Sequence, residues 1–101
     1  MLIRIVKMTF AHENVTAFQN RFQGIKENII NFEGCNLLEL YQDKANSNVF
    51  FTYSYWDSEA ALDHYRKSSF FKEVWSETKK MFIEKPEAWS VDKIVSLKHP
   101  L

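Results

Sequence analysis

The stretch Asn48–Trp56, which reads NVFFTYSYW, offers bulky apolar side chains to both sides of a strand. Alternate residues of an extended chain point to opposite faces, so Phe50 and Trp56 share one face while Tyr53 and Tyr55 share the other. A strand that faces water on one side alternates apolar and polar residues instead. The stretch therefore predicts a sheet covered on both faces, by helices on one side and by a second copy of the chain on the other.

The composition predicts one globular domain over residues 1–101, with 98–101 as a tail. Of the 101 residues, 46% are hydrophobic and 16% aromatic, which is enough for one packed core. Thirteen basic and thirteen acidic residues give a formal net charge of zero. The basic surplus of a nucleic-acid-binding protein is therefore absent. We interpret the basic pairs Arg66-Lys67 and Lys79-Lys80 as solvated helix faces.

The sequence predicts a cytoplasmic protein that does not enter a membrane. The single cysteine, Cys35, cannot form an internal disulfide, which fits a reducing compartment. The first ten residues, MLIRIVKMTF, are too few and too charged for the apolar core of a signal peptide. No apolar run approaches the ~20 residues that span a bilayer.

Seven elements are expected in the order β-α-β-β-α-α-β. Asn14 is the best N-cap type at the start of the first helix, and Pro86 is expected to stop the last one. The expected strands are Leu2–Phe10, Cys35–Gln42, Asn48–Trp56 and Glu87–Leu97. The expected helices are 15–32, Glu59–Lys67 (capped by Asp57-Ser58) and 70–84.

This order is that of an α+β, ferredoxin-like domain with four antiparallel strands and helices on one face of the sheet. The other face keeps its aromatic residues, and soluble monomers rarely expose an apolar patch of that size. The pattern therefore predicts a homodimer that buries the two sheet faces against each other, most simply around a two-fold axis.

With that plan reached, the segment Trp56–Lys72, WDSEAALDHYRKSSFFK, carries a family resemblance. It has a strand that ends in Trp, a capped short helix with an EAL core and a second helix that opens with an aromatic residue. Together with the turn Phe32–Cys35 (FEGC), these features resemble the antibiotic biosynthesis monooxygenase family of dimeric α+β barrels. The resemblance implies an α+β barrel fold formed by a homodimer. Such families include cofactor-independent monooxygenases acting on polycyclic aromatics or quinols, heme-degrading enzymes and isomerase-like enzymes.

The functional residues of these relatives are replaced in this chain. Where many members carry histidines, this sequence has Tyr65 and Phe70, with His64 one residue early. The Asn, Trp and His of the heme-degrading branch would fall at Val6, Tyr65 and Trp75. None of the three is present, so the resemblance implies no heme.

We expect no cofactor and no metal site. The three histidines, His12, His64 and His99, are widely separated and Cys35 stands alone, so no ligand spacing typical of a metal site occurs. The chain has only two glycines, and none forms a glycine-rich turn between a strand and a helix that would hold a phosphate.

Tyr65 and His64 are the candidate catalytic residues. Tyr65 is expected to point inward, where its phenol could donate a hydrogen bond to a carbonyl or peroxide oxygen; alternatively it is a core aromatic residue. His64 lies near the edge of the inward face. It could act as a base near neutral pH, or it is a partly exposed surface histidine.

The candidate substrate-binding residues are aromatic, with one carboxylate. The inward ring of Trp75 could stack on a flat ligand or pack in the core. On the strand, whichever face meets the helices is pocket or core, and the other is dimer contact. Glu39 could have a raised pKa among apolar neighbours and act as a base, or it is a solvent-facing charge. The full set is Trp75, Tyr53, Tyr55, Trp56, Phe71 and Glu39.

Three functions remain open at this point. The first is a small-molecule-binding homodimer that acts as a cofactor-independent monooxygenase on an aromatic or quinol-like ligand. The second is a non-catalytic ligand-binding or assembly domain, and the third is an isomerase or lyase with His64 or Glu39 as its base. A catalytic member needs a cavity of roughly 300 Å³ beneath the helices. Catalysis there is excluded if that space is filled by Phe18, Phe22, Phe71, Trp75 and Phe82.

Overall fold

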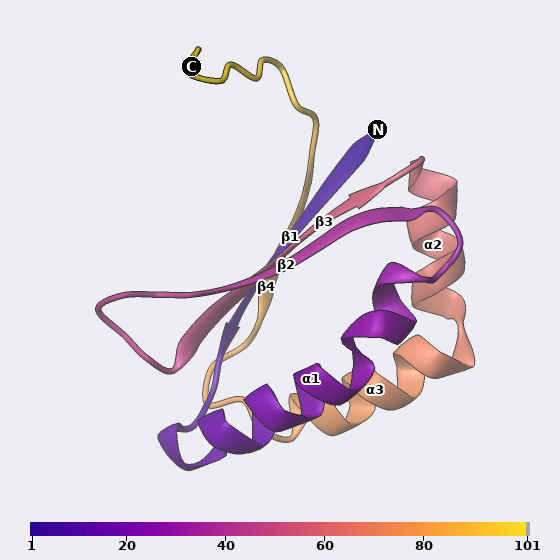
Figure 1. Ribbon diagram of the computed structural model, residues 1–101. Helices are drawn as coiled ribbons and strands as arrows, with labels where there is room; N and C mark the ends of the chain where they lie inside the picture. The colour runs from indigo at the N-terminus through magenta and orange to yellow at the C-terminus, as the bar shows by residue number, and fades with distance from the viewer. Residues whose placement is uncertain (101) are drawn as a thin grey trace.

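The computed structural model describes residues 1–100 and confirms the predicted α+β, ferredoxin-like plan (Figure 1). Four antiparallel strands form one sheet in the order β2-β3-β1-β4, and the helices lie on one face of it. Leu101, at the end of the predicted tail, lies outside the described residues. The elements are β1 (Leu2–Thr9), η1 (His12–Asn14), α1 (Val15–Ile30), β2 (Cys35–Gln42), β3 (Val49–Trp56), α2 (Glu59–Lys67), α3 (Ser69–Lys79) and β4 (Glu87–Val91).

The face of β3 that carries Phe50 and Trp56 is the one that the helices cover. Both side chains are 1% exposed and belong to the buried core together with Phe18 and Phe22 of α1. The strand register places Met8 opposite Phe50, so β1 adds its own side chains to the same face. Tyr53 and Tyr55 therefore lie on the open face.

Ser58 and Ser68 are the N-caps of α2 and α3, the two helices that follow β3. The Ser58 hydroxyl accepts a hydrogen bond from the backbone N–H of Ala61 (3.1 Å), and the Ser68 hydroxyl accepts one from the N–H of Phe71 (3.1 Å). Asn14 occupies the N-cap position of α1, as predicted, but its side chain makes no cap hydrogen bond. Its amide donates instead to the Met81 carbonyl (3.2 Å) and ties the start of α1 to the chain after α3.

The last helix ends five residues earlier than predicted, at Lys79 rather than residue 84. The residues that follow α3 instead form backbone hydrogen bonds with the end of β1 and the residues just after it. The Ala11 N–H donates to the Met81 carbonyl (3.1 Å), and the Ile83 N–H donates to the Thr9 carbonyl (2.9 Å). Phe82 lies between them, with its ring 5.2 Å from that of Phe10. The expected stop at Pro86 is therefore wrong, because tertiary pairing ends the helix first.

The last strand is also shorter than predicted, since β4 ends at Val91 and not at Leu97. Val91 pairs with Ile3, and β1 begins at Leu2, so little strand remains for later residues to pair with. Ile94 and Leu97 are each 90% exposed, and the chain beyond β4 runs away from the sheet (Figure 1).

Gly34 allows the turn between α1 and β2 to pack closely on α2. Its φ of 89° is a conformation that side-chain-bearing residues rarely adopt. A Cβ at this position would lie 2.6 Å from the Cβ of Ala61. The Gly34 carbonyl accepts a hydrogen bond from the Asp57 N–H (2.9 Å), which joins the turn to the end of β3.

Candidate functional site

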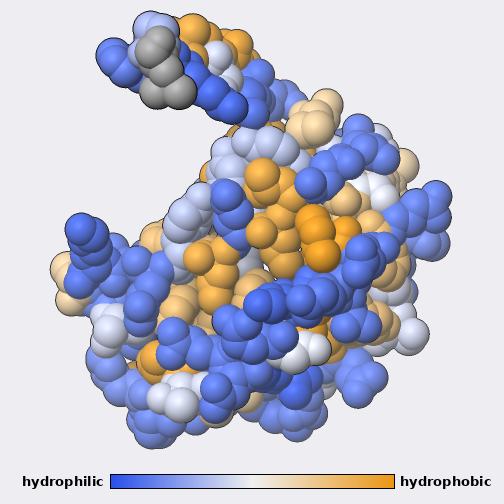
Figure 2. Space-filling model, viewed as in Figure 1, coloured by the Kyte–Doolittle hydropathy of each residue, from blue (hydrophilic) through white to orange (hydrophobic). Residues whose placement is uncertain are grey.

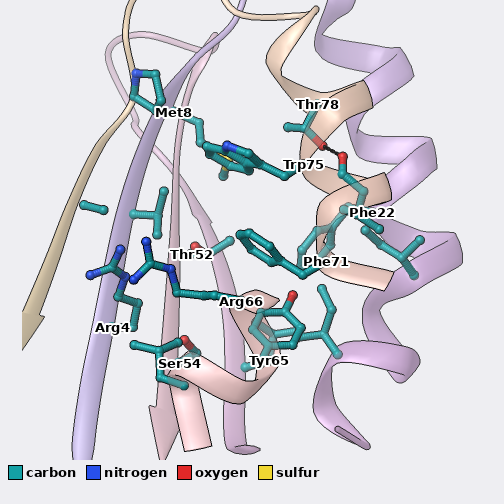
Figure 3. A pocket seen from close by; sticks show the side chains of 18 of the residues that line it. Arg4, Met8, Phe22, Thr52, Ser54, Tyr65, Arg66, Phe71, Trp75 and Thr78 are labelled. Atoms are coloured by element: carbon teal, nitrogen blue, oxygen red, sulfur yellow. Dashed lines mark hydrogen bonds between the residues drawn. The ribbon is translucent and has the colours of Figure 1, made fainter. Parts of the chain in front are cut away.

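A cavity of about 440 Å³ lies between the helices and the covered face of the sheet. Figure 2 shows hydrophobic residues gathered between the sheet and the helices, with hydrophilic residues around them. Figure 3 shows the cavity from close by, with sheet residues on one side and helix residues on the other. It is lined by Arg4, Val6, Met8, Phe18, Phe22, Ile25, Ile29, Leu38, Thr52, Ser54, Trp56, Leu62, Tyr65, Arg66, Phe71, Val74, Trp75, Thr78, Pro86 and Ala88.

Aromatic rings form much of the cavity wall. Phe71 and Trp75, one turn apart on α3, are nearly parallel, with centroids 6.0 Å apart and an interplanar angle of 11°. Trp56 stacks on Tyr65 with centroids 4.8 Å apart. Figure 3 shows the Phe71 and Trp75 rings projecting from α3 toward the sheet. The helix aromatics thus line the space without filling it, and the cavity exceeds the size that catalysis requires.

Tyr65 is the one phenol on the cavity wall. Its side chain leaves α2 among apolar and aromatic neighbours and is only 8% exposed. Burial raises the pKa of Tyr65 far above its ordinary value, with a smaller contribution in the same direction from Cys35. Its hydroxyl points into the cavity (Figure 3). The group is therefore protonated throughout the physiological range and can donate a hydrogen bond, but it cannot serve as a base.

The other hydroxyls on the wall differ in how they are bonded. The Ser54 oxygen accepts a buried hydrogen bond from the Trp56 indole N–H (3.0 Å), which fixes that ring. The Thr78 hydroxyl donates to the Val74 carbonyl within α3 (2.7 Å), so its proton is already used (Figure 3). Thr52 lies on the sheet side of the cavity between these groups.

Two arginines on the wall were missed from the sequence. Arg4 of β1 is half-buried, and its guanidinium donates to the Ser90 hydroxyl of β4 (3.0 Å). Burial, followed by the nearby charge of Arg66, lowers the pKa of Arg4, while Asp63 raises it. Arg66 of α2 is exposed, as predicted for a solvated helix face, but its side chain also extends into the same space (Figure 3). Arg4 pairs with a serine on each neighbouring strand, Ser54 of β3 and Ser90 of β4. A small polar residue among bulky strand residues is the sequence signal that points to this position.

Four candidate residues lie away from the cavity. His64 is exposed on α2, with its ring 5.7 Å from that of Phe32. Tyr53 and Tyr55 lie on the open face with their hydroxyl oxygens 3.5 Å apart, and Glu39 accepts a hydrogen bond from Tyr41 there. The candidates that the fold brings together are Tyr65, Trp56, Phe71 and Trp75.

The cavity wall carries no aspartate, glutamate or histidine. Among residues 1–100, no three side chains of the metal-binding types come together. In the same part of the chain, no helix has both the length and the apolar character required to cross a bilayer.

Several solved structures share this architecture. A conserved protein from Methanosarcina mazei Go1 is 26% identical, with a TM-score of 0.85 over 92% of this chain and 93% of that one. A crystal structure of an antibiotic biosynthesis monooxygenase is 17% identical, with a TM-score of 0.87 over 94% of this chain and 100% of that one. The protein PA3566 from Pseudomonas aeruginosa is 18% identical, with a TM-score of 0.81 over 93% and 94% of the two chains.

The sequence itself also identifies the family. No curated protein matches the chain significantly. The family model described as antibiotic biosynthesis monooxygenase, however, matches residues 1–75, which include β1, α1, the β2–β3 hairpin, α2 and the Phe71–Trp75 wall of the cavity. The chain therefore belongs to the antibiotic biosynthesis monooxygenase family.

Proposed function

We propose that the cavity binds a flat aromatic or quinol-like molecule and that the protein oxidises it with molecular oxygen, without a cofactor. The observation that carries this proposal is a cavity of about 440 Å³ walled by stacked aromatic rings, with the protonated phenol of Tyr65 pointing into it. Aromatic walls hold a flat ring, and a few placed polar groups fix its orientation.

The chemistry requires little from the protein. A substrate carbanion transfers electrons to oxygen, and a carbon–oxygen bond forms to give a peroxide. The peroxide takes up the proton that the substrate released. Loss of the remaining C–H proton then breaks the O–O bond and leaves a carbonyl group and hydroxide, which combines with that proton to form water. In this proposal Tyr65 donates a hydrogen bond to the substrate carbonyl as negative charge develops on its oxygen. The apolar wall excludes water from the carbanion.

The choice of substrate follows from the groups that the cavity lacks. Because no carboxylate or imidazole lines it, the substrate must lose its proton easily and release it to water. An anthrone meets this condition, because its carbanion is also an aromatic phenolate. The candidate bases of the isomerase or lyase alternative, His64 and Glu39, are exposed and lie outside the cavity, so the geometry favours oxidation.

The test is oxygen consumption with anthrone. We expect one oxygen molecule consumed per anthraquinone formed, at a rate well above that in buffer and with heat-denatured protein. Tyr65→Phe should lower kcat by about 100-fold, as the loss of one donor to a developing oxyanion does. His64→Ala, one position away and outside the cavity, is the matched control and should retain the wild-type rate.

Two results would contradict this proposal. If no hydroquinone or anthrone is oxidised faster than in the controls, the non-catalytic ligand-binding alternative is the better description. If Tyr65→Phe keeps the wild-type kcat, the phenol does not act in the reaction.

We also propose that the protein is a homodimer through the open sheet face. Among residues that the structure describes, Tyr41 is 50%, Trp89 44% and Val91 39% exposed on this face. Phe51 and Tyr53 lie partly exposed between them. A second copy that covers this face would bury these side chains, which a single chain leaves in water.

A further inference from the structure

We propose that the cavity selects flat aromatic ligands that carry a carboxylate, and that Arg4 and Arg66 bind this group. The inference deepens the proposed function, because it assigns a substrate class to the same cavity. It does not depend on turnover, since it concerns binding alone.

The first support is the position of the two arginines. Arg4 is the third residue of β1 and Arg66 lies in the last turn of α2, so two separate elements direct their guanidinium groups to one region of the wall (Figure 3). Ser54, opposite Arg4 in the register, adds a hydroxyl beside them. The rest of the wall is mostly apolar, which places the cationic region next to the surface that would hold a ring.

The second support is that this positive charge is not neutralised. Arg4 is held by the neutral hydroxyl of Ser90. Neither arginine has a carboxylate within the 4.0 Å of an ion pair among residues 1–100. Asp63 acts on Arg4 more weakly than Arg66 does. Arg4 is partly buried and has lost some of its hydration, and the charge of the more exposed Arg66 lies near it. A bound anion would replace that hydration and relieve the repulsion between the two charges.

The guanidinium groups indicate which anion fits. A guanidinium presents paired, coplanar N–H donors that match the two oxygens of a carboxylate. A carboxylate is also ionised at neutral pH without any base in the protein. A planar aromatic acid therefore meets both parts of the cavity, with its ring against Phe71 and Trp75 and its oxygens toward the arginines.

The test compares 2-naphthoate with 2-naphthamide, which have the same ring and nearly the same shape but differ in charge. Isothermal titration calorimetry at neutral pH should show that the acid binds at least about 10-fold more tightly than the amide. Arg66→Met and Arg4→Met should each weaken naphthoate binding by about 10-fold, because each removes one charged donor. Both should leave naphthamide binding within about 2-fold of wild type.

Lys67→Met is the matched control for Arg66→Met. Lys67 is the next residue on α2, is exposed and lies outside the cavity, so its loss removes the same charge from the protein without altering the wall. It should change neither affinity. Because Arg66 is exposed on its helix, its variant is expected to fold normally, and circular dichroism checks this for Arg4→Met.

Three results would overturn the inference: no binding of naphthoate, equal affinity for the acid and the amide, or an equal effect of Lys67→Met and Arg66→Met. The outcome is separable from that of the proposed function. Selective naphthoate binding without anthrone oxidation keeps this inference and removes the monooxygenase. Anthrone oxidation without any preference for naphthoate over naphthamide keeps the monooxygenase and removes this inference.

Discussion

Phe50 and Phe51 are neighbours on β3, yet they lie in different surroundings. Phe50 is 1% exposed and packs against Phe10 and Phe18 beneath the helices. Phe51 faces the opposite side, between Lys7 of β1 and Tyr41 of β2, and remains partly exposed. The same side chain thus stabilises the folded chain on one face and is available for a partner on the other.

The polar groups of the two faces differ in the same way. Beneath the helices, the Trp56 indole and the Ser54 hydroxyl satisfy each other in a buried pair. On the open face, the Tyr53 and Tyr55 hydroxyl groups lie within reach of each other, and the Lys93 ammonium lies 4.6 Å from the centre of the Tyr55 ring. The polar groups of the covered face are therefore hydrogen-bonded within one chain, whereas those of the open face remain accessible to solvent or to a partner.

The largest expected effect is on the stability of the covered face. Phe50→Ala should lower the free energy of unfolding by about 3–5 kcal/mol, because it leaves a cavity among rings that cannot close around it. Phe51→Ala should cost about 1 kcal/mol in dilute protein and more as the concentration rises, because in the proposed dimer Phe51 packs against a second chain. Urea unfolding at two protein concentrations measures both. Equal, concentration-independent losses would contradict the distinction between the faces.

The next effect concerns assembly. Tyr53→Glu places a carboxylate in the middle of the open face and should weaken the dimer by at least about 100-fold, since burying an unpaired charge is costly. Light scattering at low micromolar concentration should then give the 12.0 kDa of one chain, whereas the proposed wild-type dimer should give twice that mass. Lys44→Glu, in the polar loop between β2 and β3, is the control and should stay dimeric. A wild-type protein that is monomeric at this concentration would refute the dimer itself.

A smaller effect separates the hydrogen bonds of the two faces. Ser54→Ala removes the acceptor of the buried Trp56 N–H and should cost about 1–3 kcal/mol, the usual penalty of an unsatisfied buried donor. Tyr41→Phe removes a phenol that is bonded to Glu39 on the open face. In protein dilute enough to be monomeric, water can replace that bond. It should cost less than about 0.5 kcal/mol. Chemical unfolding of the two variants gives the comparison, and a reversed order would show that the open face is the better ordered one.

The smallest effect appears in alkaline solution. Burial keeps the folded-state pKa of Tyr65 far above the value of about 10 in the unfolded chain. The unfolded state therefore releases this proton first, and stability must fall as the pH rises above 10, by at most about 1.4 kcal/mol per pH unit. Unfolding of Tyr65→Phe between pH 9 and pH 11 should show a shallower loss than wild type.

The strand and helix pattern could be predicted because it depends on local spacing. The period of two in β3, the serine before α2 and the serine before α3 each act within a few residues. The two wrong ends, after Lys79 and after Val91, depend on where β1 stops and what its last residues pair with. The residues of β1 and the two element ends that they determine are some 70 to 90 residues apart in the sequence, so no local pattern predicts where α3 and β4 end.

The site was predicted in part for a similar reason. Tyr65 and Trp75 could be placed on the inner side of their helices from periodicity alone. Whether an inward aromatic residue fills the core or lines a cavity depends on the distance between α3 and the sheet, which the sequence does not encode locally. Arg66 was missed because a helical Arg-Lys pair usually faces water, and only the approach of β1 brings Arg4 toward it.

Gly34 has a consequence well beyond its own turn. The missing side chain there lets Ala61 pack directly against the backbone, and Ala61 lies in the first turn of α2, the helix that carries Tyr65 and Arg66. A methyl group at Gly34 would push that helix outward. The Tyr65 phenol and the Arg66 guanidinium would then shift with the helix. Related chains could therefore acquire new ligand preferences through this remote position while every residue of the binding wall stayed the same.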